Sequence, residues 1–171
     1  MIDADAMARV AVAPGTEGLA QIRARWPQVV ADDDTLDRAA LAARVFDDEA
    51  ARAELNAIVH PIVRALSAEC EAKALPGQIV VHEVPLLFET GLADTCDATV
   101  LVVAPLEQRI ERVQARSQIS RDKIERRIAA QIDPEEARKR ADYVIENDGS
   151  FEHLRERVAQ IYGELLKISK P

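Results

Sequence analysis

Three short runs of apolar residues are the feature that most constrains how this chain can fold. They are IVVHEV (79–84), ATVLVV (98–103) and YVI (143–145), and each contains β-branched residues. Nearly continuous apolar runs of this length are typical of strands buried on both faces, as in a parallel sheet. Helical patterns separate the last two runs, as a crossover between parallel strands requires. The sequence therefore predicts an α/β fold with a parallel sheet.

Helical patterns dominate the first half of the chain. Residues 17–75 show helical spacing of apolar residues and no strand pattern, with Thr16 as the expected N-cap of a helix at 17–25. Pro61 interrupts a later helical pattern and predicts a kink or a restart there. In the second half, helices are expected at about 105–115, 120–131, from 134 onward and from 151 to 168. The pattern predicts a sheet-forming core with a helical insertion in its first half.

Composition and charge narrow the possible function classes. With 171 residues and 48% hydrophobic content, the chain is long enough for one domain with a substantial core. Its net charge of −8 argues against a general nucleic-acid binder. No apolar run approaches the roughly 18 residues of a membrane span, and the two cysteines have neither disulfide-framework nor metal-site spacing. We therefore expect a cytoplasmic protein that binds neither nucleic acid nor a membrane and whose cysteines are not metal ligands.

Residues 105–140 are basic within this acidic chain. They hold ten basic and seven acidic residues, a local charge of +3 against −11 for the remainder. One interpretation is a pair of solvated helices with i,i+4 ion pairs. The other is a lid that handles small-molecule phosphate, because guanidinium groups bind phosphate oxygens bidentately. Arg109, Arg112 and Arg116 share one helix face, as the second interpretation requires.

Two acidic side chains are candidates for a site at the sheet. Glu89 follows the strand at 79–84, and ligands gather at the carboxyl ends of parallel strands, although an acid in a surface loop fits the pattern equally well. Near the start of the chain, only one of Asp3 and Asp5 can face a site above the sheet. A carboxylate there could accept a hydroxyl proton or hold magnesium. His60 could be a core histidine or a contact at a helix end.

An ordered set of fragments resembles the dephospho-coenzyme A kinase family. The fragments are IDADAMAR, VAPGT, LDRAALAARVF, LNAIVHP, VPLLFE, QRIERVQARS, IAAQ and ADYVIENDGS, and they extend over nearly the whole chain. That family is similar to the nucleoside monophosphate kinases, with a P-loop core, a helical region for the coenzyme A precursor and a lid. It uses ATP and Mg²⁺ to phosphorylate the 3′-hydroxyl of the adenosine ribose in dephospho-coenzyme A. The resemblance implies a core at 1–10, 77–104 and 141–171, a helical acceptor-binding insertion at 11–76, and a lid with adjoining helices at 105–140.

The resemblance also implies roles for individual residues. Asp5 would be the general base for the ribose hydroxyl, and Arg112 would be directed at the transferring phosphoryl group. The ATP-binding residues would be Arg116, Arg138, Asn147 and Gly149. The residues flanking the acceptor pocket would be Arg9, Leu36, Arg38, His60, Pro85, Leu86 and Glu89.

One motif of the family has no counterpart in the chain. None of the six glycines opens a GxxxxGK[ST] loop, whose amides and lysine hold the phosphates of ATP. In the family, IDAD ends the second strand, so we expect the central first strand and the P-loop to be absent from this chain and the true start to lie upstream of Met1. The alternative is a catalytically degenerate relative that binds dephospho-coenzyme A or acts as an interaction module.

Overall fold

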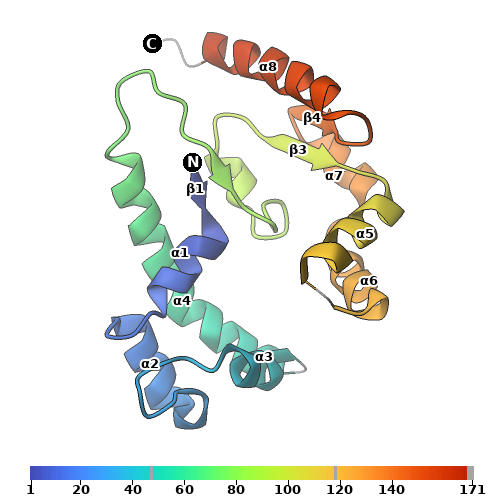
Figure 1. Ribbon diagram of the computed structural model, residues 1–171. Coiled ribbons are helices and arrows are strands. Elements are labelled where there is room, and N and C mark those ends of the chain that lie inside the picture. Colours follow the sequence, from blue (N-terminus) through green and yellow to red (C-terminus); the bar gives the residue numbers. More distant parts are fainter. Residues whose placement is uncertain (47, 118, 169–171) are drawn as a thin grey trace. The chain divides into compact units, whose positions relative to one another are not determined.

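The chain folds into two compact units that meet in sequence at Pro85. The computed structural model describes residues 1–46, 48–117 and 119–168. Unit 1 comprises Met1–Pro85 and unit 2 comprises Leu86–Pro171. Each unit combines several helices with one parallel pair of strands (Figure 1). The predicted α/β class with parallel strands is confirmed, although the described strands form two separate pairs rather than one sheet.

Unit 1 is a set of helices packed on one long helix. Its elements are β1 (Ile2–Asp3), α1 (Ala4–Ala11), α2 (Glu17–Arg25), the 3₁₀ helix η1 (Pro27–Val29), α3 (Arg38–Phe46), α4 (Glu49–Glu71) and β2 (His82–Glu83). Helices α1, α2 and α3 all contact α4 (Figure 1). The largest side chains of the core, Trp26, Ile22 and Val29, are almost completely buried. The helical stretch predicted for this part of the chain is therefore confirmed.

The start of α2 is fixed by a cap and by a close approach. Thr16 Oγ1 accepts a hydrogen bond from the Leu19 amide at 3.3 Å, as expected of an N-cap. At Gly18, a Cβ atom would lie 2.2 Å from the Ala11 carbonyl oxygen and 2.9 Å from Cδ1 of Ile62. Only glycine lets α2 lie this close to α1 and α4.

The predicted interruption at Pro61 does not end the helix. Helix α4 passes through Pro61 without a break from Glu49 to Glu71. A proline inside a helix removes one backbone hydrogen bond. Neighbouring apolar side chains, including Ile58, Val59 and Ile62, pack against the unit 1 core and hold the helix on both sides of the proline.

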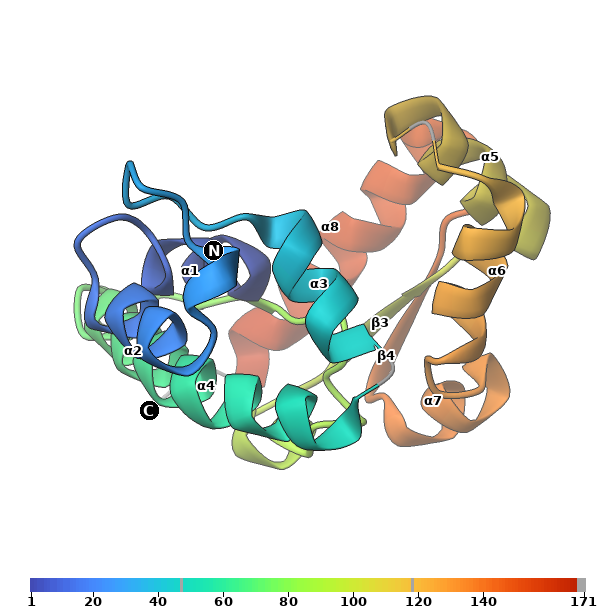
Figure 2. The same cartoon turned by 90° about the horizontal axis from the view of Figure 1, so that it is seen from below.

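Unit 2 places helices around a second strand pair. Its elements are η2 (Leu92–Thr95), β3 (Val100–Val103), α5 (Leu106–Ser117), α6 (Arg121–Ala129), α7 (Pro134–Arg140), β4 (Tyr143–Glu146) and α8 (Phe151–Ile168). Helix α7 contacts β3, α8 contacts β4, and α5 contacts α6 (Figure 2). The helices expected in this half of the chain are thus present, with bounds within two residues of those predicted.

The β3–β4 pair is parallel and anchored at its first residues. Val100 pairs with Tyr143 and Val103 pairs with Glu146. Immediately before the strands, the amide and Oγ1 of Thr99 both donate to Asp142 Oδ2 at 2.8 Å. These bonds set the register of the pair, because a one-residue shift would separate the two side chains.

The outer edge of β3 is open, and one face of the strand is exposed, contrary to the prediction of a strand buried on both faces. The carbonyls of Thr99 and Val103 accept hydrogen bonds from the β4 side, so the backbone groups of Val100 and Val102 point away from β4. Within the described residues, β3 pairs with no other strand. Val102 is 56% exposed, because no element of unit 2 covers that side chain. Similarly, the predicted strand at 79–84 pairs only at His82–Glu83.

None of the helices in the described ranges is both long enough and apolar enough to cross a bilayer.

Candidate active site

Arg112 on α5 lies against the turn that follows β4. Both of its terminal nitrogens, Nη1 and Nη2, donate to the carbonyl oxygen of Asn147 at 3.3 Å. The Asn147 amide in turn donates to the Val103 carbonyl at 2.7 Å, which fixes the turn at the end of β3. Two predicted site residues, Arg112 and Asn147, are thus in direct contact. Gly149 lies in the same exposed turn.

Arg112 retains an uncompensated positive charge. Its hydrogen bonds go to neutral oxygens, those of Asn147 and Gln108, and no ion pair to it occurs among the residues that the structure describes. The side chain is exposed. An exposed guanidinium with spare N–H donors is suited to bind an anion such as a phosphate.

Arg138 is held differently. Its Nη1 and Nη2 donate to the two carboxylate oxygens of Glu146 at 2.5 and 3.1 Å, and its Nε lies 3.3 Å from Glu135. Hydrogen bonding from Arg138 lowers the pKa of Glu146, which therefore stays ionised at neutral pH. The predicted ATP-binding arginine is thus ion-paired, and its partner Glu146 directly precedes Asn147 in the sequence.

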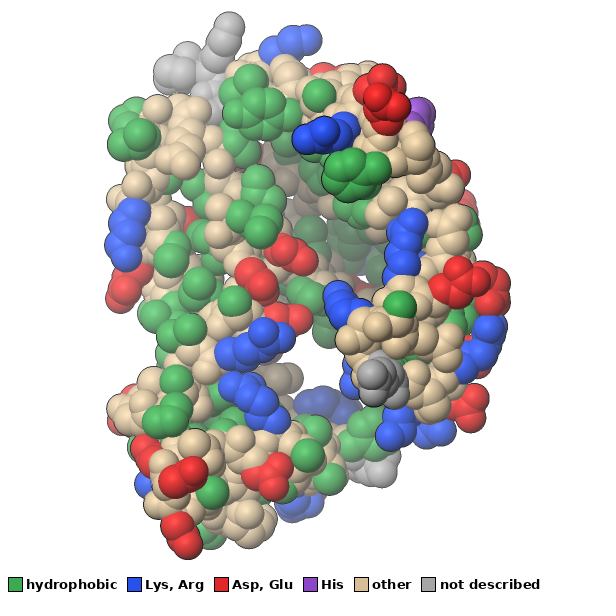
Figure 3. Space-filling model, in the orientation of Figure 1, with side chains coloured by type: hydrophobic (Ala, Val, Ile, Leu, Met, Phe, Trp, Pro, Cys, Tyr) green, Lys and Arg blue, Asp and Glu red, His purple; other side chains and the backbone are tan. Residues whose placement is uncertain are grey.

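The basic segment combines ion pairs with free arginines. Arg121 binds Glu107 at 2.7 Å and Glu125 at 2.6 Å, which matches the interpretation of solvated, ion-paired helices. Its hydrogen bond also lowers the pKa of Glu107. Arg116 is exposed and forms no ion pair within the described part of the chain. Figure 3 shows that basic and acidic side chains alternate over α5 and α6.

Glu89 contacts the protein backbone. Its Oε1 accepts a hydrogen bond from the Ile132 amide at 2.8 Å, in the connection between α6 and α7. Beside it, the Arg140 guanidinium lies 5.0 Å from the ring centroid of Phe88 and donates to the Phe88 carbonyl. The segment 86–89, which includes the exposed Leu86, is therefore attached to both ends of α7.

In unit 1, the predicted catalytic acid lies on a helix and not at a strand end. Strand β1 stops at Asp3, whose Oδ1 accepts from the Ala6 amide at 2.9 Å and caps α1. Asp5 lies in the first turn of α1, and Arg9 lies one turn later; both are exposed. Asp3 caps the helix with its carboxylate, whereas the Asp5 carboxylate is exposed to solvent. Of the two aspartates, Asp5 is therefore the one available to bind a ligand.

The other acceptor-side residues of unit 1 are dispersed. Leu36 packs against the unit 1 core and bridges Val30, while Arg38 begins α3 on the surface. His60 is exposed on α4, so it is not a core histidine, and Pro85 is also exposed. The predicted acceptor-side residues thus belong to both units: Leu86 and Glu89 are in unit 2 with all the predicted ATP-side residues, and the others are in unit 1.

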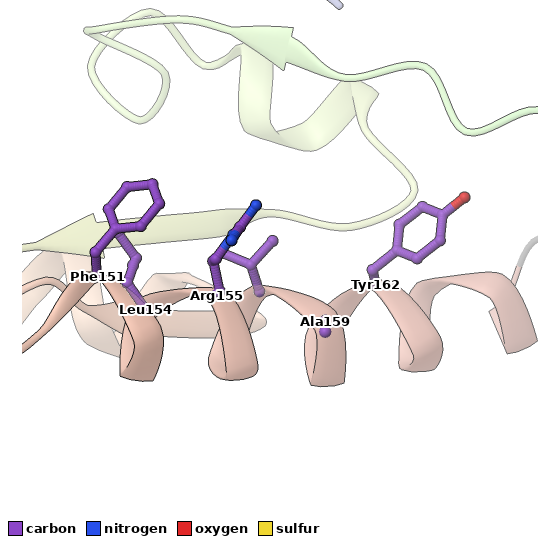
Figure 4. Close-up of a pocket in the computed structure, with 6 residues that line it drawn as sticks. Phe151, Leu154, Arg155, Ala159 and Tyr162 are labelled. Atoms are coloured by element: carbon purple, nitrogen blue, oxygen red, sulfur yellow. The ribbon is translucent and has the colours of Figure 1, made fainter.

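An apolar groove runs along α8 of unit 2, and none of the predicted site residues lines it. It has a volume of about 530 Å³ and is lined by Phe151, Leu154, Arg155, Val158, Ala159 and Tyr162. Figure 4 shows Phe151, Arg155 and Tyr162 on one side of the helix. A groove made by a single helix supplies few polar groups for orienting a substrate.

Comparison with known proteins assigns the family. The family model described as "Dephospho-CoA kinase" (CoaE) matches residues 1–153 of the chain. The chain belongs to the dephospho-CoA kinase family. Members of this family are phosphotransferases of coenzyme A biosynthesis, so the resemblance inferred from the sequence is confirmed.

Individual dephospho-CoA kinases are similar over almost the whole chain. The enzyme of Thermobifida fusca is 45% identical over 166 residues, which cover 96% of this chain and 83% of that protein. The enzyme of Deinococcus radiodurans is 47% identical over 156 residues, covering 90% of this chain and 74% of that protein.

Two solved structures have a similar fold. The crystal structure of TT1252 from Thermus thermophilus has a TM-score of 0.85 and 41% identity, and the match covers 96% of this chain and 83% of that one. The dephospho-CoA kinase from Campylobacter jejuni has a TM-score of 0.67 and 25% identity, covering 97% and 84% of the two chains.

Two residues that contact the predicted candidates or their segment were not singled out from the sequence. Gln108 contacts Arg112, and Arg140 holds the segment 86–89. Arg140 belongs to the basic segment and could have been singled out by charge alone. Gln108 carries no charge, and its contact to Asp148 spans 40 residues of sequence, so no local pattern indicates it.

Proposed function

We propose that this chain transfers the γ-phosphoryl group of ATP to the 3′-hydroxyl of dephospho-coenzyme A, the last step of coenzyme A biosynthesis. The observation that carries the proposal is the family match over residues 1–153. The uncompensated charge of Arg112 beside the Asn147 turn supports it, because phosphoryl transfer depends on positioning and charge neutralisation. The reaction consumes ATP, so we place it in the cytoplasm.

Two residues are proposed for the chemical step. Asp5, exposed in the first turn of α1, would accept the proton of the ribose hydroxyl. Arg112 would bind the oxygens of the phosphoryl group as negative charge develops on them. Its free N–H donors match such oxygens in geometry.

Four residues are proposed for ATP. Asn147 and Gly149 would contact the adenine through the turn after β4, and Arg116 would bind phosphate from the lid at 105–140. Arg138 has its charge compensated by Glu146, so its flat guanidinium suits stacking on adenine better than binding phosphate.

The acceptor side is proposed to lie on the helical region at 11–76 and on the segment after β2. Leu36 and Leu86 would supply apolar surface, and His60 a polar contact, to dephospho-coenzyme A. Glu89 would act indirectly, through its bond to the Ile132 amide. The remaining proposed contacts come from Arg9, Arg38 and Pro85.

Magnesium is proposed to enter with ATP. Among the described residues there is no group of three or more His, Cys, Asp or Glu side chains placed to hold a metal ion. Mg²⁺ commonly keeps water and substrate phosphate oxygens as most of its ligands, so such a cluster is not required. The ion would neutralise phosphate charge, while Arg112 and Asp5 act on the reacting atoms.

The finer fold that we propose is that of the P-loop kinases, with the core at 1–10, 77–104 and 141–171. The 171-residue sequence contains no GxxxxGK[ST] motif, which in that fold anchors the phosphates of ATP. The second candidate function is a catalytically degenerate relative that binds dephospho-coenzyme A without turnover.

Turnover and binding assays separate these functions. The chain is incubated with MgATP and dephospho-coenzyme A, and the 3′-phosphorylated product is measured by mass spectrometry. Turnover is expected to fall at least tenfold in Asp5→Asn and by about 10³-fold or more in Arg112→Ala, with circular dichroism unchanged. Binding of dephospho-coenzyme A in calorimetry without product would favour the second function. Failure to bind either nucleotide would overturn both functions.

A further inference from the structure

Gln108 connects the arginine of the proposed site to the turn after β4. It lies in the first turn of α5 and is half-buried. Its Oε1 accepts a hydrogen bond from Arg112 Nη2 at 3.0 Å, and its Nε2 donates to the Asp148 carbonyl at 3.5 Å. One amide group thus bridges a helix and a turn that are 40 residues apart in sequence.

The two contacts fix both the amide and the guanidinium. Only one orientation of the Gln108 amide presents its oxygen to Arg112 and its nitrogen to Asp148. Arg112 is then held at two points, at Gln108 and at the Asn147 carbonyl, which binds both terminal nitrogens. An exposed arginine without such partners samples many rotamers, and ordering it on binding has an entropic cost.

The partner of Arg112 is neutral, in contrast to the partners of neighbouring arginines. Arg121 and Arg138 are held by carboxylates, which compensate their charge. An amide oxygen orients a guanidinium without cancelling that charge. Glutamine and glutamate have the same size, so the charge of the acceptor is the property that distinguishes them here.

We propose that Gln108 is a positioning residue for the phosphoryl-transfer reaction: it fixes the Arg112 guanidinium over the Asn147 turn and leaves its charge available. The inference rests on the proposed function of Arg112. A guanidinium held in place before the reaction stabilises the transition state without first having to be ordered. Gln108 itself touches neither substrate.

Two substitutions at one position test the proposal. Gln108→Leu removes both hydrogen bonds while keeping a side chain of similar size. Because one lost hydrogen bond to a charged group costs about a factor of ten, kcat is expected to fall at least tenfold. KM is expected to change by no more than about twofold. Gln108→Glu keeps an acceptor but pairs with Arg112, so kcat is expected to fall at least as far. The matched control is Gln160→Leu on α8, where Gln160 Oε1 accepts from Arg157 Nη1 at 2.8 Å; its kcat is expected to be unchanged.

A double-mutant cycle and a spectroscopic measurement decide whether Gln108 acts through Arg112. In the Arg112→Ala background, Gln108→Leu is expected to cause no further loss of kcat. In ¹⁵N NMR, the Arg112 Nη signals are expected to be separate in the wild type and to merge in Gln108→Leu, because rotation of the guanidinium becomes faster. Unchanged Arg112 signals, or additive losses in the cycle, would overturn the proposal.

The same measurements distinguish this inference from the proposed function. If Arg112→Ala keeps full turnover, the role of Arg112 fails, whatever the NMR signals show. If Arg112→Ala loses turnover while Gln108→Leu does not, Arg112 keeps its role and the positioning role of Gln108 is wrong. The NMR signals can be measured even if the chain shows no turnover. They therefore test whether Gln108 positions Arg112 in that case as well.

Discussion

At the scale of single residues, hydrogen bonds to ionised groups determine which side chains are available for chemistry. Asp3 is committed to capping α1, whereas Asp5 is free. Arg138 is committed to Glu146, whereas Arg112 binds only neutral oxygens. The two residues proposed for the chemical step, Asp5 and Arg112, are therefore charged side chains that form no ion pair among the described residues.

The Thr99–Asp142 contact gives a prediction about pH. Hydrogen bonds from the Thr99 side chain and amide lower the pKa of Asp142. A lowered pKa contributes stability that is present above the ordinary pKa of about 3.9 and is lost as the pH falls through the folded value. Thr99→Val is therefore expected to cost about 1 kcal/mol at pH 7, because Asp142 is largely exposed to solvent, and less at pH 2.5.

Urea unfolding at the two pH values measures this difference. The control is Thr95→Val, since the hydrogen bond that Thr95 Oγ1 donates goes to the carbonyl of Leu92 and not to a carboxylate. An equal cost of Thr99→Val at both pH values would contradict the assignment.

At the scale of helices and strands, the sequence predicted what depends on local patterns. Thr16 was predicted as a cap, and it accepts a hydrogen bond from an amide of its helix. Asp133 and Ser150, which precede the helices expected from 134 and from 151, do the same. Helix α1 was missed because its eight residues directly follow a strand and carry no separate loop pattern.

The arrangement of the site depended on contacts that local patterns do not encode. The family resemblance singled out Arg112 and Asn147, yet their contact joins residues 35 apart in sequence. Gln108 was missed for the same reason. The burial of β3 was predicted wrongly, because a strand's exposure depends on which elements lie beside it and not on its own residues.

Two helical glycines give opposite predictions. Ala is intrinsically preferred over Gly in a helix by about 1 kcal/mol. At Gly163 in α8, no atom lies within 4 Å of an added Cβ, so Gly163→Ala is expected to stabilise by up to that amount. At Gly18, the Cβ would overlap the Ala11 carbonyl, so Gly18→Ala is expected to destabilise by about 1–3 kcal/mol despite the helix preference.

Thermal unfolding of the two variants checks this contrast. Fluorescence of Trp26, the only tryptophan and a buried residue of unit 1, reports on the packing around Gly18. A Gly18→Ala variant as stable as the wild type would show that α1 and α2 can separate at no cost.

At the scale of the whole molecule, the chain comprises two units, each with a small parallel strand pair. A two-stranded pair is rarely stable alone, so each pair depends on the helices of its own unit. In unit 2 these are α7, which contacts β3, and α8, which contacts β4.

The open edge of β3 has a consequence for protein homeostasis. The run ATVLVV contains no charge, proline or glycine, which is the composition of segments that form amyloid fibrils. Natural edge strands usually carry lysine or proline to prevent such growth, and β3 has valines instead. Concentrated protein at elevated temperature is therefore expected to form thioflavin-positive fibrils after a lag phase, and Val102→Lys is expected to lengthen that lag. The control is Val158→Lys, which adds the same charge at an exposed position on α8 and is expected to leave the lag unchanged. If the two variants had the same lag, fibril formation would not start from β3.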